Sequence, residues 1–205
     1  MLMKRKTRQL NRVALESLTL AVEVFNRPST TARTSGVLLQ LQHALEMLFK
    51  AIVFEKRGTL YPKDGRITFS FAACLGILRS EAGLLDEQEA IVAATVDSHR
   101  DAVQHHGALL RDELLYVDAA SGLRLFDELL CRAFGVRLAD HPEFAARMLP
   151  ISATPPRELH LLVTTDLEHI RDLLGPGRRR HAEALAFLRP YVMSDRVATN
   201  AHEID

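Results

Sequence analysis

Cysteine, aromatic residues and net charge are all scarce in this sequence of 205 residues. The two cysteines, Cys74 and Cys131, lie far apart and outside any C-x-x-C motif, so neither a disulfide framework nor a zinc site is indicated and a reducing compartment is expected. The 26 basic residues are balanced by 26 acidic ones, which argues against the overall positive charge with which many proteins hold DNA. The apolar run that follows the basic N-terminus is interrupted by Glu16 and Glu23, unlike a signal sequence or a membrane span. We therefore expect a cytoplasmic protein with no membrane association.

What the sequence does contain is helical periodicity. Apolar residues recur at steps of three and four along most of the chain, which is the spacing of one face of an amphipathic helix. Ser70 and Asp86 precede two such stretches as N-cap residues, and Gly58 and Gly135 follow two others as termination signals. Only residues 66–71 alternate in the manner of a strand. The predicted helices cover about residues 7–26, 31–57, 70–81, 86 into the histidine segment, and 109–134, the last with Gly122 as a possible weak point.

The sequence pattern changes after residue 138. Residues 149–156 hold three prolines and indicate a stiff, turn-rich connector, and two further helical patterns cover residues 157–174 and 178–193. We expect an all-α fold, with an up-and-down helical bundle in residues 1–138, a C-terminal helical extension in residues 139–193 and a frayed tail in residues 194–205.

Residues 98–107 read SHRDAVQHHG and gather an arginine, a carboxylate and histidines at the expected end of a helix. Asp101 and His105 are four apart and share a helical face, so the carboxylate can bond the imidazole and favour its protonated form. Arg100 and His105 are five apart and point roughly 140° away from each other in an unbroken helix. They can converge if the helix ends between them, which Gly107 makes plausible, or if two copies of the chain contribute jointly.

An arginine and a histidine beside one phosphodiester form a catalytic set for RNA. The guanidinium binds the phosphate and stabilises the charge that builds on its oxygens. The imidazole can take a proton from the ribose 2′-hydroxyl or deliver one to the leaving oxygen. Because the substrate supplies its own nucleophile, the reaction needs no metal and no cofactor, and it leaves a cyclic phosphate.

The order and spacing of these residues resemble the HEPN superfamily (higher eukaryotes and prokaryotes nucleotide-binding). Its arginine, polar residue and histidine are spaced as in residues 100–105, RDAVQH. The upstream segment HALEMLFKA, residues 43–51, is similar to a second hallmark of several branches, a helix reading H-A-x-E-x-x-x-K-A. The FSFAACL segment at residues 69–75 also fits one poorly characterised branch. The resemblance covers about residues 10–136.

The resemblance implies a helical domain of four or five helices that dimerises with its two motif segments facing each other. It also implies metal-independent endoribonuclease activity, often in toxins or anti-phage defence effectors that cut tRNA or other RNA, with an antitoxin or another protein as a partner. Many members carry asparagine where Asp101 stands, and a carboxylate, unlike a neutral amide, repels phosphate. By position, Arg100 would bind phosphate, His105 would be the acid/base and Asp101 its polar partner, with His106, Glu46 and Lys50 in possible supporting roles.

Simpler explanations exist for each of these residues. Arg100 can form a surface ion pair with Asp97 or Asp101, and His105 can interact with the carbonyl end of its helix. Glu46 and Lys50 have the order and spacing of a stabilising pair within one helix. The alternative function is a non-catalytic, oligomeric binding or adaptor module for a protein partner or a nucleotide, which the zero net charge, the aromatic content of 6% and the extra C-terminal helices favour.

Overall fold

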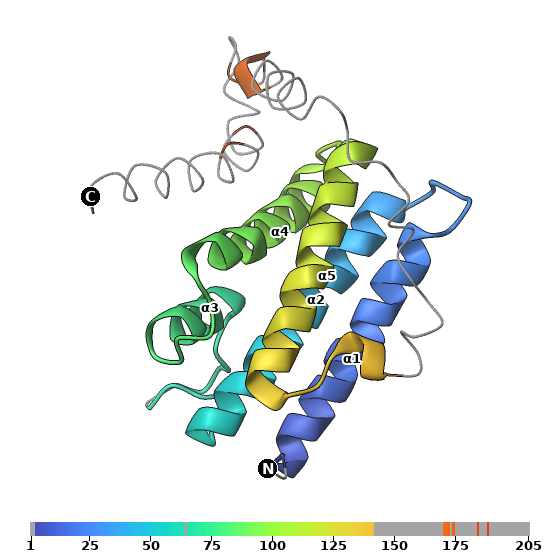
Figure 1. Cartoon of the computed structure of the whole chain (residues 1–205). Helices are drawn as coiled ribbons and strands as arrows, with labels where there is room; N and C mark the ends of the chain where they lie inside the picture. Colours follow the sequence, from blue (N-terminus) through green and yellow to red (C-terminus); the bar gives the residue numbers. More distant parts are fainter. Residues whose placement is uncertain are drawn as a thin grey trace, which may run out of the picture.

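The computed structural model describes residues 3–63, 65–141, 170–172, 174, 184 and 188. Figure 1 shows α1, α2, α4 and α5 running alternately up and down, with the shorter α3 beside the end of α2. No strand occurs among the described residues. The predicted all-α, up-and-down bundle is therefore confirmed. Its elements are α1 (Arg5–Phe25), α2 (Arg33–Arg57), α3 (Phe71–Ser80), α4 (Glu87–His106), α5 (Asp112–Phe134) and the short 3-10 helix η1 (Leu138–Asp140).

Capping side chains set the starts of α3 and α4. The Ser70 hydroxyl accepts a hydrogen bond from the backbone N–H of Ala73 at 3.2 Å, as the sequence predicted. Asp86 accepts one from the backbone N–H of Glu89 at 2.8 Å, and the Glu89 carboxylate accepts one from the Asp86 N–H at 3.0 Å. This reciprocal pair is a capping box, which satisfies two N–H groups that a helix start would otherwise leave unpaired.

Glycine ends three of the helices. Gly58, Gly107 and Gly135 follow α2, α4 and α5 with φ angles of 73°, 63° and 70°. This left-handed conformation costs other residues a clash with their own Cβ, so glycine is favoured at the position just past a helix. The end of α4 is thus fixed after His106, not within the histidine motif.

The central helix of the bundle is α2, which contacts α1, α3, α4 and α5. Leu41, Leu45, Leu48 and Ile52 are each at most 2% exposed along it. By length and composition α2 is apolar enough to cross a membrane, yet 61% of its most apolar window is buried by other parts of the chain. Such burial is typical of the core helix of a bundle, since a helix that is apolar on most sides must be covered.

Gly122 marks a close approach of two helices and not a weak point, because α5 continues through it without a break. A Cβ at this position would lie 2.9 Å from Cδ2 of Leu41 on α2. The absent side chain therefore lets α5 pack directly against the central helix.

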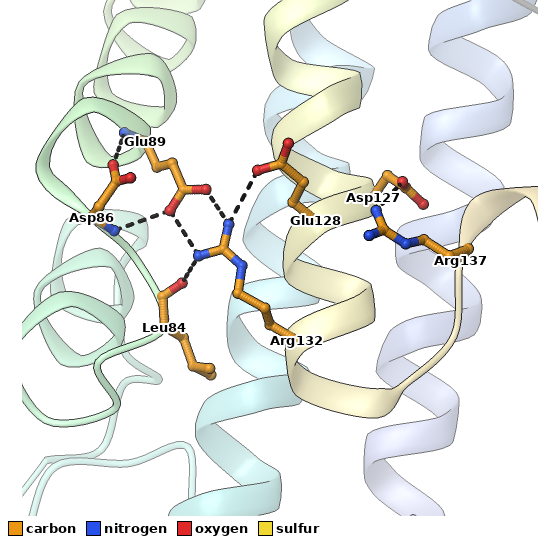
Figure 2. A network of polar contacts seen from close by, with 7 residues as sticks. All are labelled: Leu84, Asp86, Glu89, Asp127, Glu128, Arg132 and Arg137. Atoms are coloured by element: carbon orange, nitrogen blue, oxygen red, sulfur yellow. Dashed lines mark hydrogen bonds and ion pairs between the residues drawn. The ribbon is translucent and has the colours of Figure 1, made fainter.

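Arg132, near the end of α5, ties this helix to the start of α4 (Figure 2). Its guanidinium donates to the backbone carbonyl of Leu84 at 2.5 Å and to the Glu89 carboxylate at 2.9 Å. It also forms an ion pair with Glu128, one turn earlier on α5, at 3.3 Å. The hydrogen bond from Arg132 is the main cause that lowers the pKa of Glu89 below its usual range. One carboxylate thus serves both the capping box and the contact between helices.

The expected strand is absent, and most of the expected C-terminal region lies outside the described residues. Residues 66–70 form bends and irregular backbone and not a strand, with the N–H of Phe69 bonded across the loop to the carbonyl of Leu60 at 2.9 Å. The connector at residues 149–156, most of the expected extension and the tail at residues 194–205 lie outside the described residues. Of the extension, Ile170 and Ala184 are buried and form a cluster with Ala102 and Ala108 at the end of α4.

Candidate functional site

The motif residues Arg100, Asp101, His105 and His106 occupy the last two turns of α4. The helix runs through all of them and ends at Gly107. The idea that the helix breaks between Arg100 and His105 is therefore wrong, because the left-handed glycine follows the second histidine and does not separate the motif. Within one chain, Arg100 and His105 can therefore approach each other only because their side chains are long enough to reach around the helix.

Asp101 brings Arg100 and His105 together. The Nη1 atom of Arg100 lies 2.6 Å from Oδ1 of Asp101, and Nε2 of His105 lies 3.9 Å from the same oxygen. The first distance is a charge-assisted contact. The second is too long for a hydrogen bond and becomes an ion pair when the imidazole is protonated. The two cationic groups thus share one carboxylate oxygen, although their Cα positions lie on different sides of the helix.

Arg100 is also held by Asp97, one turn earlier on α4. Its Nη2 donates to Oδ1 of Asp97 at 3.1 Å, and only 20% of the Arg100 side chain is exposed. Its Nε is buried and has no hydrogen-bond partner. Burial raises the pKa of the Asp97 carboxyl above its usual range, the Arg100 charge opposes this shift, and the nearby Asp101 charge adds to it. Arg100 therefore forms the ion pairs expected of it with both acids and still has one donor unused.

The second predicted segment lies against this cluster. Gln42 of α2 donates to Oδ1 of Asp97 at 3.1 Å and to Glu46 at 3.4 Å. Lys50 pairs with Glu46 at 2.6 Å, with side chains only 13% and 22% exposed, which confirms the pair expected within the helix. Polar contacts thus connect Lys50 and Glu46, through Gln42 and Asp97, to Arg100. Gln42 was not predicted, because an amide on a largely apolar helix gives no signal of its partner on another helix.

A buried pair next to the motif was also missed. Nδ1 of His99 lies 2.7 Å from Oδ2 of Asp118 on α5, and the two side chains are 7% and 6% exposed. The imidazole of His99 is enclosed between α4 and α5. The available signal was Asp118 itself: it lies on the apolar face of its helix, where a carboxylate requires a buried partner.

The histidines at the end of α4 differ from His99 in exposure. His105 has 64% of its side chain exposed, and His106 is also exposed. Within the part of the chain that the structure describes, no group of three or more His, Cys, Asp and Glu side chains is placed to hold a metal ion. The site therefore offers a half-buried guanidinium beside an accessible imidazole.

Charge decides what this arrangement can bind. Around Arg100 and Lys50 stand three carboxylates, those of Glu46, Asp97 and Asp101. An incoming phosphate gains attraction from Arg100 only if it displaces one of them. Asp101, with 39% of its side chain exposed, is the one that can turn away into solvent. The oxygen position that Asp101 leaves would lie between a guanidinium and an imidazole, which is the environment that stabilises a phosphate oxygen.

Comparison with known proteins gives a family for this chain. A family model described as a domain of unknown function (DUF3644) matches residues 9–172, and one described as a domain of unknown function (DUF8611) matches residues 162–204. Neither the curated proteins nor the solved structures include a match to the sequence. The first model spans the helical bundle and well over half of the sequence. The chain therefore belongs to the DUF3644 family.

Proposed function

We propose that this protein is a metal-independent endoribonuclease of the HEPN type, which acts as a homodimer on RNA such as tRNA. The observation that supports this most is the contact of Arg100 and His105 with one oxygen of Asp101, at 2.6 and 3.9 Å. An oxyanion at that position is already flanked by the two groups that the reaction requires. We take the Asp101 carboxylate as the occupant that a phosphate oxygen of the substrate replaces.

The reaction then follows from the chemistry of the two side chains. Arg100 binds the scissile phosphate through Nη1, which now contacts Asp101. Neutral His105 takes the proton of the ribose 2′-hydroxyl, and the oxygen attacks phosphorus. The bond from phosphorus to the 5′-oxygen breaks, and that oxygen takes a proton from the partner's His105 in its protonated form. The products are a 2′,3′-cyclic phosphate and a 5′-hydroxyl.

The dimer places the second histidine. His105 is at the accessible end of α4, and Leu109, three residues beyond His106, is 90% exposed. Contact between the α4 ends of two copies would cover this leucine and bring both motifs to one cleft. In a cell, such an activity would suit a toxin or an anti-phage defence effector with an antitoxin as its protein partner.

The variants Arg100→Ala and His105→Ala test the assignment on total RNA, tRNA and synthetic single strands. Each should lower the cleavage rate by roughly 100-fold or more, because each removes charge stabilisation or proton transfer from the chemical step. Arg124→Ala on the exposed face of α5 is the matched control and should leave cleavage unchanged. His106→Ala shows which of the adjacent imidazoles acts. Cleavage at the parental rate by both motif variants, with circular dichroism and gel filtration unchanged, would contradict the proposal.

A second candidate is a non-catalytic helical module that binds a protein partner. The observation that favours it is that Arg100 is held by two carboxylates within its own chain, which weakens its attraction for RNA. A purified dimer that cleaves none of the RNA classes and carries a second protein through purification would favour this function over the first.

A further inference from the structure

Gln42 is a buried amide on the central helix α2, and its side chain reaches the Arg100 cluster on α4. The residue is 5% exposed, and its Nε2 donates to Oδ1 of Asp97 at 3.1 Å and to Oε2 of Glu46 at 3.4 Å. Both acceptors are carboxylates, so the NH₂ group of the amide and not its carbonyl oxygen must face them. The orientation of Gln42 is therefore fixed, and α2 supplies a donor to an acid of α4.

One oxygen of Asp97 joins Gln42 to Arg100. Oδ1 of Asp97 accepts from Nε2 of Gln42 and from Nη2 of Arg100, each at 3.1 Å. Asp101 contacts the other terminal nitrogen of Arg100, since its Oδ1 lies 2.6 Å from Nη1. The guanidinium is planar and rigid, so the direction of Nη1 is set once Nη2 is held. Asp97 therefore orients Nη1 even when Asp101 no longer contacts it.

The two carboxylates differ in how firmly they are held. Asp97 is bonded to a second helix through Gln42, and 28% of its side chain is exposed. The described contacts of Asp101 are with Arg100 and His105 of its own helix, and 39% of its side chain is exposed. An incoming phosphate should therefore displace Asp101 and leave Asp97 in place.

We propose that Gln42 and Asp97 are positioning residues, which together hold Nη2 of Arg100 while the scissile phosphate replaces Asp101 at Nη1. This role rests on the proposed ribonuclease function, and both residues act through Arg100 and not on the substrate. Orientation matters because a misplacement of about 1 Å can lower the rate of the chemical step by about 100-fold. Loss of this hold should therefore lower kcat more than it raises KM.

Gln42→Met tests the contribution of α2, because methionine is close in size to glutamine and cannot donate a hydrogen bond. On an RNA that the parental protein cuts, it should lower kcat by roughly threefold to tenfold, as for one lost hydrogen bond, and change KM by less than about twofold. Gln40→Met is the matched control, since Gln40 is half-buried on the same helix and about 200° away around its axis. It should leave both constants unchanged.

Asp97→Asn and Asp97→Leu separate orientation from charge. Both remove the negative charge, but the amide oxygen of asparagine can still accept from Gln42 and Arg100, whereas leucine has no acceptor. The kcat of Asp97→Asn should therefore be about tenfold or more above that of Asp97→Leu. Equal kcat for these two variants, or parental kcat for Gln42→Met, with circular dichroism unchanged, would overturn the proposal.

An NMR measurement on the Arg100 guanidinium distinguishes failure of this proposal from failure of the ribonuclease function. In ¹⁵N-labelled protein, the hydrogen bonds of Arg100 should slow rotation of its guanidinium and give separate Nη1 and Nη2 signals, assigned by their loss in Arg100→Lys. Asp97→Leu should lower the temperature at which these signals merge. An unchanged temperature would overturn the positioning role even if RNA is cut. A parental protein that cuts no RNA would overturn the ribonuclease function and, with it, this role in catalysis.

Discussion

Replacing Asp118 by alanine should destabilise the bundle more than any surface change. The carboxylate is 6% exposed and bonds Nδ1 of His99, itself 7% exposed, at 2.7 Å. The alanine variant leaves the His99 N–H buried without this acceptor. Removal of one member of a buried polar pair costs about 3–5 kcal/mol. For a chain of this size each kcal/mol lowers the melting temperature by roughly 2–4 °C, so a decrease of about 6–20 °C is expected.

Two further substitutions separate the pair from simple loss of packing. Asp118→Asn keeps an acceptor oxygen but not the charge, and should cost only about 1–2 kcal/mol. The double variant His99→Leu with Asp118→Leu removes both polar groups together. Its cost in free energy of unfolding should be less than the sum of the costs of His99→Leu alone and Asp118→Leu alone. Glu113→Ala, at an exposed position on the same helix, is the control and should cost at most about 1 kcal/mol.

Urea unfolding followed by circular dichroism at 222 nm measures all of these free energies of unfolding. The reasoning is refuted if Asp118→Ala costs less than about 1 kcal/mol, or if the double variant costs the full sum of the single ones. Either result would mean that His99 and Asp118 do not depend on each other for their hydrogen bond. A confirmed coupling would show that the half of α4 that carries Arg100 is fixed to α5 by this pair.

Three other predictions concern packing, thiol reactivity and acid stability. Gly122→Ala should lower the free energy of unfolding by about 1–2 kcal/mol, since the new Cβ would lie 2.9 Å from Leu41, whereas Gly76→Ala, with no atom within 4 Å, should raise it by up to about 1 kcal/mol in the same urea assay. Burial raises the pKa of the Cys74 thiol to about 11, so DTNB should label Cys131 in the native protein and Cys74 only after unfolding; rapid labelling of both would contradict this. The pKa of Glu89 is lowered from 4.5, chiefly by the hydrogen bond from Arg132, so its contribution is present above about pH 4.5 and is lost as the pH falls below that value. Glu89→Gln should therefore flatten the loss of stability between about pH 5 and 3, and an unchanged pH profile would contradict the assignment.

Local rules predicted much of the helical frame. Ser70 and Asp86 were recognisable as N-caps, and Gly58 and Gly135 as helix ends, because each satisfies backbone groups of its own segment. The pair of Glu46 and Lys50 also followed from spacing along one helix. The glycine rule was misapplied at residue 107, where it was taken to allow a break inside the motif, although the residue in the left-handed conformation comes after the helix.

The rest depended on contacts between helices, which spacing along the chain does not encode. Gln42 reaches Asp97 across 55 positions, and His99 reaches Asp118 across 19. Gly122 gave the sequence signal of a helix weakness, yet its role is to admit Leu41 of another helix. Polar residues on apolar helical faces were the overlooked indication in most of these cases.

Analysis of the cleavage products tests the proposed function of Arg100 and His105 most directly. A short RNA is incubated with the protein in EDTA, in parallel with the same RNA methylated at every 2′-oxygen. The account predicts fragments that end in a 2′,3′-cyclic phosphate and begin with a 5′-hydroxyl, formed from the unmodified RNA alone and absent with Arg100→Ala or His105→Ala. Cleavage of the methylated RNA, or unmodified RNA cut equally well by both variants, would contradict it.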